Sequence, residues 1–579
     1  MRNFFKSALV LVSVALFAVS CSKDTEERKV ASANGSLLSY IPADSPYVFG
    51  QLGPLDDDVL DELEPAFDEV LAAYGDVIDA FLASDFEDQP DSEMDEEAAA
   101  KVRAVGGIIS EMMSVEGLES AGIKRGDLSV LYGNGLLPVL RAQISDQAAM
   151  EDLLARIEKE MEAEMSTDEI DGVSYKYLGD EGRLIIAFVH EQMVITLIPE
   201  EASDDLLRSQ LGLTKPDRSM ADSGELQALA EKYDYLEAGL MLIDMTRMAD
   251  IFVSEPNAAN AEVLELAEYD ASELDDVCRA EIKEVARIMP RMVAGLRNFD
   301  TEKLGVHMIM EMREDLAAGM SQLVAPVQGM GLVPGNLFSF GMSLDLAATR
   351  EFYIARLDAL VADPFECELF EEAQADLEET RAALNQPLPP IVYSIKGFFA
   401  VVDGMDGMDA ANQVPPTSVD ASFLVSAENP QGLVAMGAMF SPELAAMNLQ
   451  PDGNPAALDL PPGTPMAEDA FVAMTDVSLA LSVGEDSESR LSGLMESEFA
   501  TPSPFMTIDM DSNAYYNLVA DSIEFGEPAD GEEEMDPEVQ KAMAAATRAI
   551  ADLYKRESMV ITFTERGVEI AAESVFNLD

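Results

Sequence analysis

Gly239-Leu240-Met241-Leu242-Ile243-Asp244 is the stretch that decides the fold, because Met245–Val253 follows it at once with helical spacing. A short apolar run bounded by an aspartate has the length of a β-strand. The aspartate suits a helix N-cap, since its side chain accepts hydrogen bonds from the first free backbone amides of a helix. The stretch therefore predicts a strand that leads directly into a helix.

The same pattern recurs along the chain. Apolar runs that end in Asp or Ser precede helical periodicity at Pro138–Asp146, Leu337–Asp345, Ala421–Ser426 and Phe505–Asp511. This recurrence predicts duplicated structural units, although its spacing is too irregular for a solenoid.

Hairpin-like pairs lie between these units. Val173–Leu178, Arg183–Val189 and Gln192–Ile198 form an expected meander, and Ser558–Thr564 with Gly567–Val575 form a closing hairpin. Hairpins combined with crossover helices predict an α+β fold with antiparallel or mixed sheets.

A helical hairpin is expected near the start of the folded region, over about residues 56–113. Apolar residues recur every three or four positions from Leu60 to Phe81, and a second helix is expected from Asp95 to Met113. Pro65 predicts a break or a new first turn. The hairpin could be a partner-binding coiled coil, but we expect it to pack on the main core. Residues 36–255 are then an N-terminal domain and residues 256–579 a C-terminal domain.

The N-terminus has the pattern of a secretory signal over residues 1–20. Arg2 and Lys6 precede the apolar run Ala8–Phe17, and small residues lead to Cys21. The 14 residues from Ser7 to Ser20 are too few to span a bilayer, which needs about 20. An ordinary signal peptide would contain Cys21 only by coincidence.

Ala18-Val19-Ser20-Cys21 resembles the lipobox of bacterial lipoproteins. The resemblance implies cleavage before Cys21, diacylglycerol on its thiol and acylation of its new amine. It also implies retention at the outer membrane, because Ser22 stands where aspartate would keep a lipoprotein in the inner membrane. Residues 21–35 then form a lipidated tether, and no other membrane segment is expected.

Pro42-Ala43-Asp44-Ser45-Pro46 opens the folded region. This element resembles the opening of a group of uncharacterised bacterial periplasmic proteins, which begin with Pro-Ala-Asp-Ser/Thr-Pro. The resemblance is short and implies no catalytic residue.

The charge of the chain is extreme. Removing residues 1–20 leaves 34 basic against 110 acidic side chains, a formal charge of −76. Such a polyanion lacks the cationic phosphate contacts that nucleic acid requires, so we expect no nucleic-acid partner. With 48% hydrophobic residues the chain is nevertheless expected to fold rather than remain disordered.

Catalytic motifs are scarce. The two histidines, His190 and His307, stand in no zinc-binding arrangement. Gly341-Met342-Ser343-Leu344-Asp345 lacks the last glycine of a nucleophile elbow. We expect no enzyme activity and no cofactor, with a periplasmic hydrolase as a remote alternative.

Metal-binding patterns are equally weak. The run Asp509–Asn513 begins like an EF-hand loop but places Ala514 and Ala520 where Gly and Glu are required. Asp403, Asp406 and Asp409 are expected in an exposed turn. Met308, Met310 and Met312 share one strand face and could bind Cu(I), but methionine more often fills a core. No metal is expected.

Cys278 and Cys367 remain once Cys21 is lipidated. Both are expected on helices, and an oxidising compartment favours a disulfide between them. The alternative is two separate buried thiols. The function expected from these observations is that of a non-catalytic binding or structural lipoprotein facing the periplasm, with an unidentified protein partner or apolar ligand. A carrier of lipid or another apolar ligand is the second expectation.

Overall fold

The computed structural model describes residues 36–578 except for 85–95, 125, 180–181, 255–257, 268, 270–273, 332–334, 407–415, 440–443, 445–446, 448, 460–468 and 526–534. The chain is 43% helical and 29% strand, which confirms an α+β fold. Every strand pair whose register is described is antiparallel.

The chain divides into two compact units. Unit 1 comprises Met1–Val306, Pro528–Leu553 and Phe576–Asp579, and unit 2 comprises His307–Glu527 and Tyr554–Val575. The expected boundary at 255/256 lies inside unit 1. Strand pairing explains the difference, because β8 (Leu240–Asp244) pairs with β9 (Arg291–Phe299) across that point.

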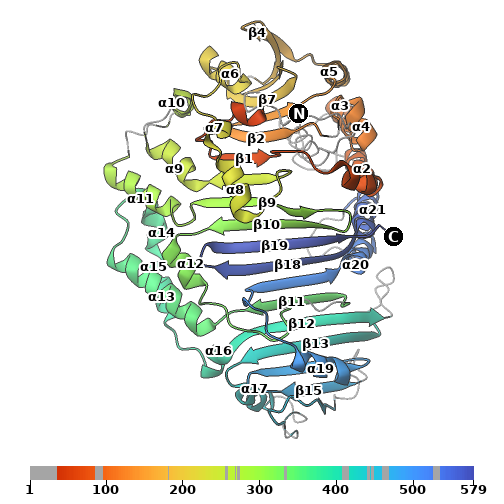
Figure 1. The fold of residues 1–579 in the computed structure, drawn as a ribbon, viewed down its shortest axis with the longest axis vertical. Coiled ribbons are helices and arrows are strands. Elements are labelled where there is room, and N and C mark those ends of the chain that lie inside the picture. Colours follow the sequence, from red (N-terminus) through yellow and green to blue (C-terminus); the bar gives the residue numbers. More distant parts are fainter. Residues whose placement is uncertain are drawn as a thin grey trace. The chain divides into compact units, whose positions relative to one another are not determined.

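The sheet of unit 1 has the strand order β4–β5–β6–β7–β3–β2–β1–β8–β9 (Figure 1). The chain then enters β10 (Lys303–Glu311), which ends in unit 2. The remaining strands of unit 1 are β1 (Tyr47–Gly50), β2 (Ser129–Asn134), β3 (Leu137–Gln143), β4 (Ser166–Ile170), β5 (Val173–Leu178), β6 (Gly182–Val189) and β7 (Gln192–Pro199).

The sheet of unit 2 repeats this topology with the order β14–β15–β16–β13–β12–β11–β17–β18–β19. β11 takes the place of β1, β17 that of β8, and β12, β13 and β16 those of β2, β3 and β7. The two sheets thus share one strand order from β5 to β9 and from β14 to β18, whereas β4 has no counterpart among the described strands of unit 2. The strands are β11 (Phe338–Ser343), β12 (Ile395–Asp406), β13 (Ser418–Ala427), β14 (Ala456–Ala457), β15 (Ala470–Met474), β16 (Ser478–Val483), β17 (Met506–Asp511), β18 (Tyr554–Thr564) and β19 (Gly567–Phe576).

Strand-to-helix junctions follow the expected pattern in both units, except that Asn429 and not Ser426 caps the helix after β13. Asp244 accepts hydrogen bonds from the amides of Thr246 and Arg247, and Asp345 accepts one from Ala348. Asp146, Asn429 and Asp511 likewise cap the helices after β3, β13 and β17. Each cap satisfies a backbone amide that a helix leaves unpaired.

The helices of unit 1 are α2 (Asp57–Ala83), α3 (Glu96–Glu111), α4 (Val115–Ser120), α5 (Gln147–Met161), α6 (Asp204–Leu211), α7 (Met220–Ser223), α8 (Glu225–Tyr233), α9 (Met245–Val253), α10 (Ala258–Leu266), α11 (Asp276–Ala286), α21 (Pro537–Leu553) and the 3₁₀ turn η1 (Leu37–Tyr40). The expected helical hairpin is α2 with α3. α2 packs against α3 and α21, and α3 packs against α5. The expected break at Pro65 is wrong, because α2 is one helix that buries Leu60 and Leu63 before the proline and Leu82 after it.

The helices of unit 2 are α12 (Glu314–Met320), α13 (Leu346–Ala362), α14 (Glu371–Ala375), α15 (Leu377–Leu384), α16 (Pro390–Ser394), α17 (Pro430–Gly437), α19 (Ser487–Glu496), α20 (Ser512–Phe525) and the 3₁₀ turn η4 (Glu368–Phe370).

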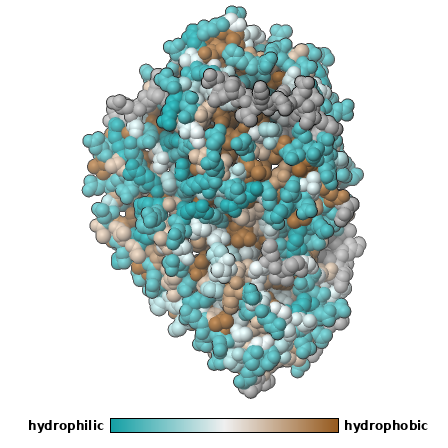
Figure 2. Space-filling model, viewed as in Figure 1, coloured by the Kyte–Doolittle hydropathy of each residue, from teal (hydrophilic) through white to brown (hydrophobic). Residues whose placement is uncertain are grey.

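The surface seen in Figure 2 is mostly hydrophilic, and its apolar residues lie in separate small groups. This agrees with the high formal charge of the chain.

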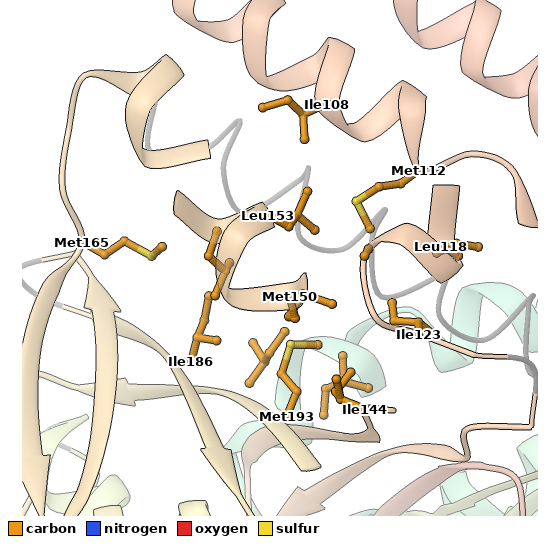
Figure 3. Packing of buried hydrophobic residues seen from close by; sticks show 14 residues of the cluster. Ile108, Met112, Leu118, Ile123, Ile144, Met150, Leu153, Met165, Ile186 and Met193 are labelled. Carbon is orange, nitrogen blue, oxygen red and sulfur yellow. The ribbon is translucent and has the colours of Figure 1, made fainter. Parts of the chain in front are cut away.

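Helices α3, α4 and α5 cover one face of the unit 1 sheet. Ile108, Met112 and Leu118 come from α3, α4 and the link between them, and Met150 and Leu153 come from α5. They pack with buried strand residues that point to the same face, Leu140, Ile186, Met193 and Ile195 (Figure 3). The strands β3 and β7 are buried on both faces as a result.

Candidate functional site

In three strands of unit 2, β11, β16 and β17, small or polar residues are buried and large apolar residues are only half-buried. In β11, the small residues Ser339, Gly341 and Ser343 are buried, whereas the large apolar residues between them are only half-buried. Those larger residues are Phe338, Phe340 and Met342. A sheet with one solvated face normally turns its apolar side chains inward. Here the apolar side chains line the more exposed face.

Strand register extends this face across neighbouring strands. Phe340 stands opposite Ala400 of β12 and Ile508 of β17, Ala400 stands opposite Phe423 of β13, and Phe423 stands opposite Leu481 of β16. Residues directly opposite each other in an antiparallel pair share a face. We name this surface the open sheet face; its residues are Phe338, Phe340, Met342, Phe398, Ala400, Val402, Ala421, Phe423, Val425, Leu479, Leu481, Val483, Met506, Ile508, Met510, Met559 and Ile561, and none of them is buried.

Aromatic side chains form a continuous ladder on the open sheet face. The ring centroids of Phe340 and Phe398 are 5.6 Å apart, and those of Phe398 and Phe423 are 5.9 Å apart. Phe423 retains 45% of its side-chain exposure. The other residues of the open sheet face are half-buried, so the face is a contiguous apolar surface that stays partly exposed, a feature that can mark a binding site.

The opposite face of the same sheet is closed. Phe399 and Leu424 pack there with Leu491 and Leu494 of α19. Small polar side chains fill the remaining positions, and the Ser422 hydroxyl donates to that of Ser482 at 3.0 Å. Small residues let α19 approach the sheet closely, so the core of unit 2 lies on this side. The open sheet face ends at β15, where Val472 is buried opposite Leu481.

Polar groups border the open sheet face beside α20. Tyr515 stacks on Phe338 with ring centroids 6.1 Å apart, and Glu557 accepts hydrogen bonds from the hydroxyls of Ser512 and Ser574, each at 3.3 Å. Burial and a hydrogen bond with Glu557 raise the pKa of Tyr516 above its usual range. These groups keep the margin of the face polar at neutral pH.

His307 and Glu569 form the strongest cluster of titratable groups in unit 2. His307 is 1% exposed, and its Nε2 lies 3.1 Å from Glu569 Oε2. The Thr564 hydroxyl donates to Glu569 at 2.7 Å, and the Arg566 guanidinium donates to both of its oxygens. Burial raises the pKa of Glu569, but these hydrogen bonds and the Arg566 charge outweigh burial and bring the pKa to about 2. The carboxylate is thus held ionised in a clamp on the β18–β19 turn.

The clamp does not form a nucleophile–base pair. Its one hydroxyl, that of Thr564, already donates to the carboxylate. The other histidine, His190, lies in the β6–β7 turn with a positive φ of 54°. Ser343, from the incomplete elbow motif, is fully buried and bonds to both backbone groups of Ala325. These contacts are structural.

In the two acidic runs considered as metal sites, Asp403 and Asp509 contact arginine side chains. Asp403 lies 3.2 Å from Arg490 of α19, and burial raises the pKa of Asp403. Asp409 lies outside the described residues. Asp509 bonds to Arg556, while Asp511 caps α20. Among the residues that the structure describes, no group of three or more His, Cys, Asp or Glu side chains is arranged to hold a metal ion.

The methionine run lies on β10 and just beyond it. Met308 and Met310 are half-buried and alternate with the buried residues His307 and Ile309. Met312 follows the strand, and its amide donates to the Arg566 carbonyl.

Cys278 and Cys367 are both buried and disulfide-bonded. Cys278 lies on α11 as expected, whereas Cys367 is the N-cap of η4 rather than a helical residue. Their pairing with one another stays a prediction. Cys21 and the rest of the signal and tether lie outside the described residues.

The open sheet face was not among the site residues expected from sequence. The signal that could have found it is the strict alternation of large apolar with small polar residues, as in Phe338-Ser339-Phe340-Gly341-Met342-Ser343. None of the helices that the structure describes has the length and apolar content to span a membrane. Comparison with protein-family models, with curated proteins and with solved structures finds no match to this chain.

Proposed function

We propose that this chain is a non-catalytic envelope lipoprotein, held at the outer membrane through Cys21, whose open sheet face binds an apolar partner surface. The observation that carries the proposal is the inverted alternation of β11, β16 and β17. Exposing Phe and Met while burying Ser gives no benefit to folding, because apolar burial is the main driving force of folding. The arrangement makes sense where a partner covers the face.

Binding of an uncharged fluorescent probe, N-phenyl-1-naphthylamine, tests the face. The full chain carries Cys21→Ser so that no acyl chain competes. Saturable binding is expected, and the double variant Phe398→Ser/Phe423→Ser should weaken it about tenfold or more, since each ring contributes on the order of 1 kcal/mol. The matched control is Leu369→Ser, because Leu369 is 64% exposed but lies away from these strands on η4. Equal binding by parent and double variant would refute the proposal.

The lipid anchor is tested separately. Cys21→Ser should release the protein from the membrane fraction or leave its signal uncleaved. Unchanged membrane association, together with an unmodified N-terminal peptide in mass spectrometry, would contradict the lipoprotein assignment.

A carrier of lipid or another apolar ligand is the second candidate. The aromatic and thioether side chains of the open sheet face favour it, since both pack well against hydrocarbon. Native mass spectrometry separates the two candidates, because a carrier should retain a small ligand through purification and a docking module should not.

A further inference from the structure

We propose that the occupant of the open sheet face is a cationic amphipathic helix of a partner protein. This inference rests on the proposed function, since it names what the face binds.

The duplicated unit indicates what such a face accepts. The row Leu131, Leu140 and Ile195 in unit 1 occupies the same strand positions as Ala400, Phe423 and Leu481 in unit 2. Helices α3, α4 and α5 cover the unit 1 row: Leu140 and Ile195 are buried at 3% and 7% exposure, and Leu131 is partly buried.

Among the residues that the structure describes, unit 2 shows no helical cover equivalent to α3–α5. The helix after β13, α17, has 8 residues where its counterpart α5 has 15. The helices between β11 and β12 stand in the place of α2–α4, yet α13, η4, α14 and α15, all described in full, contain no buried residue. A helix supplied by a partner would complete unit 2 as α3–α5 complete unit 1.

The open sheet face has depressions that fit the side chains of a helix. Ala400 lies between Phe340 and Phe423 in one row, and Ala421 lies between Val402 and Val483 in another. Small residues between larger ones leave depressions that can receive Leu or Met side chains projecting from one stripe of a helix. Met342, Met506 and Met510 add adaptable contacts, as methionine does on surfaces that bind varied helices.

The acidic character of unit 2 favours basic residues on the polar side of the bound helix. From Gly397 to Ser489, the segment that contains β12 from its third residue onward and all of β13, β15 and β16, the sequence has 14 Asp and Glu residues and no Lys or Arg; Lys396 of β12 and Arg490 of α19 flank it. A helix with Lys or Arg on its polar side complements this segment, whereas an anionic lipid headgroup is repelled. The observations therefore favour a basic helix over a lipid.

The probe is a synthetic peptide of about 18 Leu and Lys residues, long enough to form a helix, with Leu on one stripe. It should bind the full Cys21→Ser chain saturably, displace N-phenyl-1-naphthylamine and gain helical circular dichroism. Phe398→Ser/Phe423→Ser should weaken it about tenfold or more, and Leu369→Ser should leave it unchanged. A matched peptide with Glu in place of Lys should not bind.

Three outcomes overturn this inference. Peptide binding that the double variant leaves unchanged would be general attraction to an acidic protein. Displacement of the dye by phosphatidylglycerol vesicles but not by the peptide would assign the face to acyl chains. Dye binding without peptide binding refutes the helix alone, whereas absence of both refutes the proposed function as well.

Discussion

Units 1 and 2 share a strand order and differ in what covers their sheets. In unit 1 the strands β3 and β7 are buried on both faces, and apolar residues occupy both sides of the strand. In unit 2 the equivalent strands β13 and β16 are buried on one face, where Ser and Ala occupy most positions and Leu424 is the one large apolar residue. One topology can therefore close a sheet completely or leave one face available for binding. The residues of each strand differ accordingly between the fully covered sheet and the sheet with one open face.

The disulfide is expected to have the largest effect on stability. If Cys278 pairs with Cys367, the bridge joins a residue of unit 1 to one of unit 2 and closes a loop of about 90 residues. Such a loop contributes about 4–5 kcal/mol in the chain-entropy model. Peptide mapping without reduction should find the two cysteines linked, and Cys278→Ser/Cys367→Ser should lower the denaturant midpoint. Recovery of the two peptides unlinked to one another would exclude the pairing.

A matched pair of truncations tests the comparison directly. Leu140→Ala on the covered face of unit 1 should destabilise the protein by about 2–4 kcal/mol, because it leaves a cavity under α5. Phe423→Ala, at the equivalent position of unit 2, should cost less than about 1 kcal/mol, because its side chain already contacts solvent. Urea unfolding measures both. Similar losses at the two positions would mean that the open sheet face is covered within the chain.

Acid should remove the stabilisation that the ionised Glu569 clamp contributes. The folded pKa of about 2 lies below the ordinary value of 4.5, so the ionised form stabilises the fold above pH 4.5. That stabilisation, on the order of 3 kcal/mol, should be lost as pH falls from 4.5 towards 2. Glu569→Gln should therefore destabilise unit 2 at pH 7 and match the parent near pH 2.

The exposed turn residue Glu565 supplies the control for the clamp. Glu565→Gln should leave the acid profile of thermal unfolding unchanged. A parent profile that is flat between pH 5 and pH 2.5 would show that Glu569 is not held ionised by its partners.

Salt should have the smallest effect. Screening of the chain's formal charge of −74 should raise the melting temperature by a few degrees up to a few tenths molar NaCl, where the Debye length falls below about 6–10 Å. If thermal unfolding shows two transitions, the one that Leu140→Ala shifts belongs to unit 1. The other transition then belongs to unit 2, which contains the segment without Lys or Arg. A melting temperature that falls with NaCl would indicate that the acidic groups are already paired.

Local chemistry made much of the fold predictable. The junctions at Asp146, Asp244 and Asp345 were predictable because an N-cap depends on a few neighbouring residues. The domain boundary was not, because β8 and β9 pair across the 46 residues of α9–α11 and their connections. Continuation of α2 through Pro65 likewise depends on tertiary burial of Leu60, Leu63 and Leu82.

The candidate site was harder to predict for a different reason. Alternation in Phe338–Ser343 shows which side chains share a face but not which face the rest of the chain covers. The usual assumption places Phe inward and Ser outward, and the packing of α19 on the serine side reverses it. Coverage is a property of the whole unit, so strand sequence alone cannot decide it.

Methionine on the open sheet face links the binding surface to oxidative chemistry. Met342, Met506, Met510 and Met559 present their thioethers on a half-buried surface instead of inside a core. Oxidation to the sulfoxide converts such a side chain from apolar to polar. Each oxidised residue would make the face more hydrophilic while the packed core beneath it stayed intact. A protein built in this way would lose its affinity for apolar partners on oxidation before it lost its fold.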